Sequence, residues 1–178
     1  MTVKSTWKRV AVGLTGAALA LGLAACSAQP GVAVSVNGET YTEDAVGEVS
    51  LELSQIFGQF IEPAAVASLL IVEPAVVEVA DANGIEFTEA DARKRLASFE
   101  EEAGEPLSDA TVSVFRMNEL LKVLGSGPDA QAAQIQIAEA IQGLDAELNP
   151  RYGELDENNL MLPVTLDGVI DMREVQPN

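Results

Sequence analysis

Apolar side chains recur at three- and four-residue steps along most of the chain between residues 46 and 144. This spacing places them on one face of an α-helix, and glycine, proline and short polar residues interrupt it where helices usually end. The pattern predicts five helices whose apolar faces pack on one another. The expected inward-facing residues are Val46, Val49, Leu53, Ile56, Phe57 and Phe60, then Val66, Leu69, Leu70, Val76, Val77 and Ala80, then Ala92, Leu96 and Phe99, then Val114, Met117, Leu121 and Leu124, and finally Ile137, Ile141 and Leu144.

The first two helices have recognisable start signals. Thr42 can cap the first, which we expect to run for about 19 residues as the longest amphipathic element. Pro63 suits the first turn of the second, and Asn83-Gly84 is a stop signal. Pro74 lies inside the second helix, where it removes one backbone donor. We therefore expect a kink there or two shorter helices.

The remaining helices begin with similar signals. Thr88 followed by Asp91 resembles a capping box, which predicts the start of the third helix. The fourth is expected to begin near Ser108 and to end in the glycines of residues 125–127. Pro128 opens the fifth.

Short strands are expected near both ends of this helical region. Val32, Val34 and Val36 alternate with small or polar residues and precede Asn37-Gly38, which suits a type I′ turn. Ala146–Leu148 is expected to be extended because Asn149 precedes a proline. One further strand, Met161–Leu166, is expected in an otherwise irregular tail. The predicted fold class is mainly α with a small β element.

The first 26 residues resemble the signal and lipobox of a bacterial lipoprotein. Basic residues stand at positions 4, 8 and 9, and an apolar run of about 15 residues follows, which is short for a membrane span. The run ends in Leu23, Ala24, Ala25 and Cys26, the spacing at which such a cysteine receives a diacylglycerol. The alternative is an ordinary cleavage site beside a free or buried thiol.

The lipobox resemblance implies a division of the chain and a location. Residues 1–25 would be the signal peptide, 26–31 the lipidated start and tether, 32–148 the helical domain and 149–178 a C-terminal segment. The protein would be anchored on the outer face of the cell membrane by acyl chains alone. With the sole cysteine acylated, the fold would depend on its apolar core without disulfides.

The strong negative charge limits the partners. Cleavage before Cys26 removes three basic residues and no acids, which leaves 7 Lys and Arg against 28 Asp and Glu, a formal charge of −21. Nucleic acid and anionic lipid surfaces repel such a body. The charge serves solubility alone or also attracts basic and unfolded segments, and composition does not separate these readings.

The residues offer little for catalysis. The chain has no histidine, and its one cysteine is the expected lipid site, so the usual general base, zinc ligands and thiol nucleophile are missing. Residues 100–102 form an acidic group typical of a solvated helix face, and the sequence around Asp156 lacks the spacing of a calcium loop. Gly125 and Gly127 are not followed by the lysine of a phosphate-binding loop. We expect no enzyme activity, cofactor or metal.

A longer resemblance covers residues 32–125. The ordered segments "VSVNGETYTEDAV", "ASLLIVEPAVVEVADANGIEFTEADARKRL" and "FRMNELLKVL" resemble the N-terminal domain of the SurA and PrsA class of exported foldase-chaperones. "NPRYG" near the end is similar to a group of short actinobacterial lipoproteins with such a domain. The resemblance implies a helical module that binds unfolded polypeptide. The paired histidines of the class's parvulin prolyl-isomerase domain are absent.

Two further sets of residues are candidates for contacts. Phe57, Phe60, Met117 and Leu121 could line an apolar peptide-binding groove, because aromatic and methionine side chains repack around varied partners. The alternative is that these four residues belong to the core. Arg151 and Tyr152 are expected to lock the fold locally, with Arg151 meeting a carboxylate.

The sequence therefore favours a non-enzymatic, lipid-anchored chaperone-like protein that binds extended segments of exported proteins. The alternative is an interaction or structural lipoprotein that docks one specific folded partner. Neither the client nor the oligomeric state follows from the sequence.

Overall fold

The fold is mainly α with a small β element, as predicted. The computed structural model describes residues 30–162, and five helices lie within that range. They are α1 (Glu43–Phe57), α2 (Pro63–Ala82), α3 (Glu89–Ala103), α4 (Asp109–Ser126) and α5 (Ala130–Gln142). The strands are β1 (Val32–Val36), β2 (Glu39–Thr42), β3 (Ala146–Leu148), β4 (Glu154–Leu155) and β5 (Met161–Leu162).

β1 and β2 form the hairpin that starts the fold. Val36 pairs with Glu39, so the turn contains only Asn37 and Gly38, whose φ angles are +49° and +85°. Positive φ at both central residues is what a type I′ turn requires. The sequence predicted β1 and the turn, but not β2 as a paired strand. β3 completes a three-stranded antiparallel sheet by pairing with the other edge of β1.

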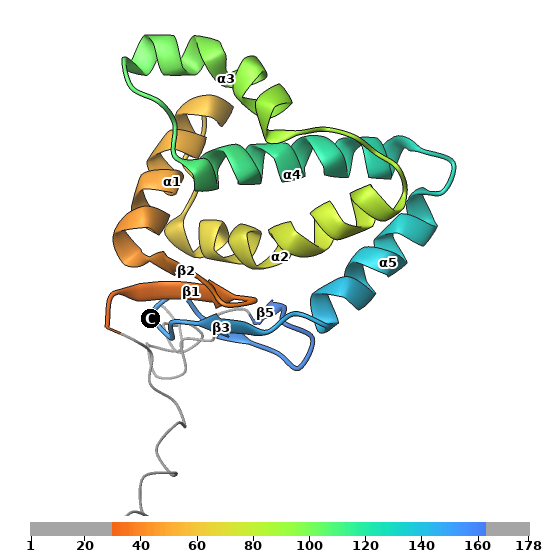
Figure 1. The fold of residues 1–178 in the computed structure, drawn as a ribbon. Helices are drawn as coiled ribbons and strands as arrows, with labels where there is room; N and C mark the ends of the chain where they lie inside the picture. Colours follow the sequence, from red (N-terminus) through yellow and green to blue (C-terminus); the bar gives the residue numbers. More distant parts are fainter. Residues whose placement is uncertain (1–29, 163–178) are drawn as a thin grey trace, which may run out of the picture.

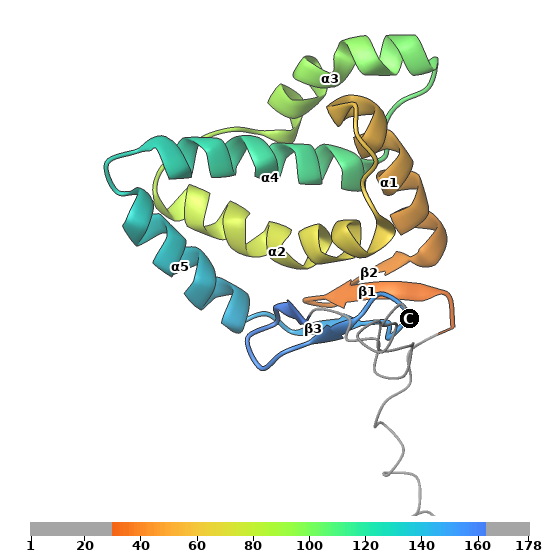
Figure 2. The ribbon, with the colours of Figure 1, turned by 180° about the vertical axis from the view of Figure 1, so that it is seen from behind.

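α2 lies at the centre of the helical layer. Figures 1 and 2 show it between α4 and the sheet, and it packs against α1, α4, α5 and β1. Most of the predicted inner face is buried, while Leu69 and Val77 are partly buried against the same core. The main core joins this helix to the inward faces of its neighbours, including Leu53, Leu120 and Val34.

The first helix is shorter than predicted. α1 ends at Phe57 after 15 residues, because Gly58 follows it with a left-handed φ of +66°. Such a glycine commonly ends a helix, since it adopts this conformation without a Cβ clash. The expectation that the apolar stripe continues to Phe60 within one helix was therefore wrong. Phe60 lies in the connection to α2.

Pro74 does not divide the second helix. α2 is one element of 20 residues with Pro74 inside it, so the alternative of two shorter helices was wrong. The ribbon bends near the middle of its length (Figure 1), which agrees with a proline that cannot donate to the preceding turn.

The predicted caps of α3 and α4 are confirmed, whereas α5 begins at Ala130, two residues after the expected Pro128, because Asp129 is the residue that precedes its first turn. Thr88 and Asp91 form a complete capping box at the start of α3, and the Ser108 side chain accepts from the Thr111 amide at the start of α4. α3 packs mainly on α4 and is the helix farthest from the sheet in both ribbon views (Figures 1 and 2).

The segment after β3 is bonded to β1 and to the first turn of α1. Arg151 pairs with Glu43 at 2.5 Å, which confirms the expected contact with a carboxylate. The Asn149 side-chain amide donates to the Val32 carbonyl at 2.9 Å, and the Asn149 backbone amide donates to the Ala33 carbonyl at 2.9 Å. β4 and β5 then form a small hairpin. The predicted strand at residues 161–166 is present at its first two residues, and the others lie outside the described range.

Candidate functional site

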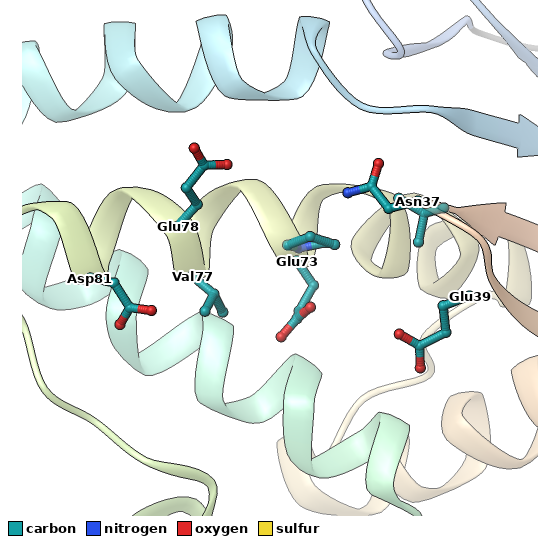
Figure 3. Close-up of a pocket in the computed structure, with 8 residues that line it drawn as sticks. Asn37, Glu39, Glu73, Val77, Glu78 and Asp81 are labelled. Atoms are coloured by element: carbon teal, nitrogen blue, oxygen red, sulfur yellow. The ribbon is translucent and has the colours of Figure 1, made fainter.

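A pocket lies between the β1–β2 turn and the second half of α2. Its volume is about 510 Å³. The floor is apolar and four carboxylates surround it (Figure 3). The lining residues are Val36, Asn37, Glu39, Glu73, Pro74, Val77, Glu78 and Asp81. A concave site with an apolar floor and a few polar groups is the usual form of a binding site.

The hairpin side of the pocket is fixed by hydrogen bonds to the end of the helical layer. The Asn37 amide donates to the Asp145 carbonyl at 2.8 Å. The Asp145 amide donates back to Asn37 Oδ1 at 3.1 Å. This reciprocal pair holds the turn against the chain just after α5, so Glu39 on β2 keeps its place beside α2.

The helix side follows from the period of α2. Glu73, Val77 and Asp81 stand at four-residue steps and therefore occupy one face. Figure 3 shows the carboxylates of Glu39, Glu73 and Asp81 on the same side of α2, whereas that of Glu78 points towards α5. The acidic rim thus flanks the apolar floor on two sides.

Two groups near the pocket have shifted pKa values. Burial raises the pKa of Glu73 above its ordinary value, Glu39 raises it further, and Arg116 of α4 opposes the shift. Burial also raises the pKa of Tyr41 on β2, with the Glu39 charge adding to it. Perturbed groups in a cleft mark it as a candidate functional site.

The chemistry of the pocket suits the binding of a cationic side chain. Carboxylates over an apolar floor match a cation on an aliphatic stem, as in Lys or Arg side chains. Within residues 30–162, no group of three or more His, Cys, Asp or Glu side chains is arranged to hold a metal ion. The chain contains no histidine that could work with Glu73 as an acid–base partner.

The structure does not gather the four predicted peptide-binding residues into one groove. Met117 is buried in the main core with 1% of its surface exposed, so for this residue the core alternative is right. Phe57, Phe60 and Leu121 are 39%, 73% and 36% exposed. None of the four lines the pocket beside α2.

Sequence reasoning missed the acidic pocket. The four-residue steps of Glu73, Val77 and Asp81 could have placed these residues on one helix face. Nothing local links that face to Glu39, because the contact joins elements more than 30 residues apart in the chain.

The predicted lipid site and membrane location are not addressed by the fold. Cys26 and the lipobox residues Leu23, Ala24 and Ala25 lie outside the described residues. Among the described helices, α2 alone is long and apolar enough to cross a membrane. Eight of its 20 residues are buried in the fold, and this burial in the core accounts for much of the apolar composition.

Comparisons with known proteins give no relative. No family model, curated protein or solved structure matches the chain.

Proposed function

We propose that the protein is a non-enzymatic, lipid-anchored binding protein with a chaperone-like role, which holds extended segments of other exported proteins outside the cytoplasm. The location rests on the lipobox resemblance at Cys26, and the client class on the resemblance of residues 32–125 to the SurA and PrsA class. The lipid anchor would keep the domain close to the outer face of the cell membrane, where newly exported chains emerge.

The observation that supports binding most directly is the pocket between the hairpin turn and α2. Val36, Pro74 and Val77 offer apolar contact, while Glu73 and Asp81 on the same helix offer negative charge. This combination favours segments in which lysine or arginine alternates with aliphatic residues. The acidic balance of the whole chain favours the approach of such segments.

The second candidate function is docking to one specific folded partner. The exposed Phe60 favours it, because a single well-exposed aromatic side chain can act as an anchor in a partner's pocket. A chaperone and a dedicated docking protein differ in how many unrelated chains they bind.

The experiment compares protection of several unfolded clients by the soluble form beginning at Ser27. Near-stoichiometric amounts should suppress aggregation of unrelated basic clients. The double variant Glu78→Gln/Asp81→Asn should protect less, whereas Glu48→Gln/Asp129→Asn should protect normally. The control removes the same charge from exposed positions away from the pocket. Protection of no client, together with capture of a single envelope protein, would favour the docking function.

The lipid anchor needs its own test. Cys26→Ser should abolish incorporation of a labelled fatty acid and release the protein from membranes. Continued membrane retention of this variant would contradict the anchor but would leave the binding proposal standing.

A further inference from the structure

α3 lies outside the main core. None of its side chains belongs to the cluster that joins α1, α2, α4, α5 and β1. Instead Ala92 and Leu96 of α3 form a second, smaller cluster with Leu107 and Val112. Figures 1 and 2 show α3 above α4, on the side opposite α2 and the sheet.

The apolar contact of α3 covers a surface made by other elements. Ala92 and Leu96 are fully buried, and Phe99 is partly buried. These residues follow at i, i+4 and i+7, the stripe with which an amphipathic helix enters a groove. Beneath them lie Leu107, Val112 and the partly buried Ile56, Phe87 and Phe115.

The charges around this contact are complementary. Arg93 pairs with Asp109, and Arg95 pairs with Glu119 of α4. The Arg95 guanidinium also lies 4.8 Å from the centre of the Phe87 ring. Each ion pair has one well-exposed partner: the side chains of Arg95 and Asp109 are 57% and 98% exposed, whereas Glu119 is only 13% exposed. Such pairs select a partner of the right charge more than they add stability.

The chain after α3 is bonded both to α3 and to α1. The Leu107 amide donates to Glu100 of α3 at 3.2 Å, and Arg93 of α3 donates to the Leu107 carbonyl at 3.4 Å. At Ser108 the bonds are to α1 instead. The Glu52 carboxylate of α1 accepts from the Ser108 amide at 3.1 Å, from the Ser108 hydroxyl at 2.6 Å and from the Thr111 hydroxyl. These bonds fix the start of α4 to α1.

The chain before α3 is also held. The Asn83 side chain donates to Gln136 of α5 at 2.9 Å, and the Ile85 amide donates to the Ala80 carbonyl at 2.9 Å. The Arg116 Nε donates to the Phe87 carbonyl at 2.7 Å. Departure of α3 would therefore leave in place the part of the surface made by Ile56, Phe87, Val112 and Phe115, whereas Leu107 would lose its two bonds to α3.

We propose that the surface beneath α3 is a second binding site, for an amphipathic helical segment of another protein that replaces α3. The resident helix shows the required pattern: apolar residues at i, i+4 and i+7, with basic residues at i+1 and i+3 to meet Asp109 and Glu119. The proposal rests on the proposed function only in taking a protein segment as the ligand. It concerns a different surface from the pocket beside α2.

The test uses a labelled peptide with the sequence of residues 88–104 and the intact lipidated protein in nanodiscs, with empty nanodiscs as the blank. The protein variant Leu96→Asp loosens its own α3 and should bind the peptide at least tenfold more tightly than the wild type, because the resident helix competes for the same surface. A peptide carrying Leu96→Asp should not bind. Replacing both arginines of the peptide with glutamine should weaken binding about three- to tenfold.

Two controls make the outcome decisive. Far-ultraviolet circular dichroism shows whether the Leu96→Asp protein keeps the helices of the core, and the milder Arg93→Gln/Arg95→Gln protein repeats the comparison. Glu78→Gln/Asp81→Asn should leave peptide binding unchanged even if it reduces client protection, which separates this site from the pocket. Equal binding of the normal and Leu96→Asp peptides would overturn the proposal.

Discussion

α2 and α3 differ in how the rest of the molecule surrounds them. α2 is packed by three helices and a strand, and its inner side chains form the main core. α3 packs chiefly on α4, and only Ala92 and Leu96 are fully buried on it. Because burial of apolar surface is the dominant stabilising contribution, α2 should open only when the whole domain unfolds. α3 should open without the rest of the domain.

The largest expected effect comes from shortening a core side chain of α2. Leu70→Ala should lower the free energy of unfolding by about 2–5 kcal/mol, because it leaves a cavity in a fully packed site. Leu96→Ala should lower global stability less, since its loss is limited to the free energy that attaches α3. Urea denaturation of both variants measures the difference. Equal losses of global stability would show that α3 is part of the same cooperative unit.

The next effect concerns the hydrogen bonds that join the start of α4, on which α3 packs, to α1. Glu52→Ala removes the acceptor for the Ser108 amide and hydroxyl and for the buried Thr111 hydroxyl, and should cost about 2–3 kcal/mol. Glu48→Ala, one turn earlier on the same helix and exposed, is the matched control and should change stability by less than about 0.5 kcal/mol. Similar values for the two variants would contradict the role assigned to Glu52.

Acid should affect the two helices in opposite directions. At Glu73 the folded pKa is raised by burial, so the folded state binds more protons than the unfolded state above the ordinary carboxyl range. That contribution to stability is present at low pH and is lost as pH rises through the folded pKa. Glu73→Gln should therefore gain stability relative to wild type between pH 4 and pH 7, as measured by urea denaturation at each pH. A constant difference would contradict the shift.

At Asp91 the folded pKa is lowered, because the Thr88 side chain and amide donate to the carboxylate. Its contribution is present above the ordinary carboxyl pKa and is lost as pH falls through the lowered value. Acid should therefore increase amide exchange in α3, after correction for the intrinsic rate, more than in α2. Asp91→Asn should remove most of that pH dependence, and an unchanged profile would exclude the capping box as its cause.

The smallest effect comes from salt. At about 1 M ionic strength the Debye length falls to about 3 Å, so the pairs Arg93–Asp109 and Arg95–Glu119, each with one exposed partner, should weaken. Amide exchange of α3 should rise less than about tenfold, whereas exchange of α2 should stay constant. The Arg93→Gln/Arg95→Gln variant should be insensitive to salt in both helices. A response that persists in this variant would assign the effect to something other than these pairs.

The parts of the fold that depend on local chemistry could be predicted from the sequence. Thr42, Thr88 and Ser108 cap helices as expected, and Asn37-Gly38 makes the hairpin turn, because each acts through groups a few residues away. The early end of α1 also depends on a nearby residue, Gly58, which could have been recognised as a stop signal. The predicted helix extends past it because the apolar pattern continues to Phe60.

The candidate site could not be predicted because it depends on pairings between distant elements. Glu39 meets the face of α2 only after β1, β3 and the chain following α5 have come together. Likewise, Met117 and Leu121 stand one turn apart on α4, and only the neighbouring helices determine that Met117 is buried and Leu121 is exposed.

Native-state hydrogen exchange of the intact protein, resolved along the chain at increasing urea, tests most directly the claim that a fixed core carries a separable helix. The amides of α3 should exchange through an opening that depends weakly on urea, while α2 and α4 remain protected until global unfolding. If α3 and α2 share the same free energy of opening and the same urea dependence, α3 does not detach, and the site proposed beneath it does not exist.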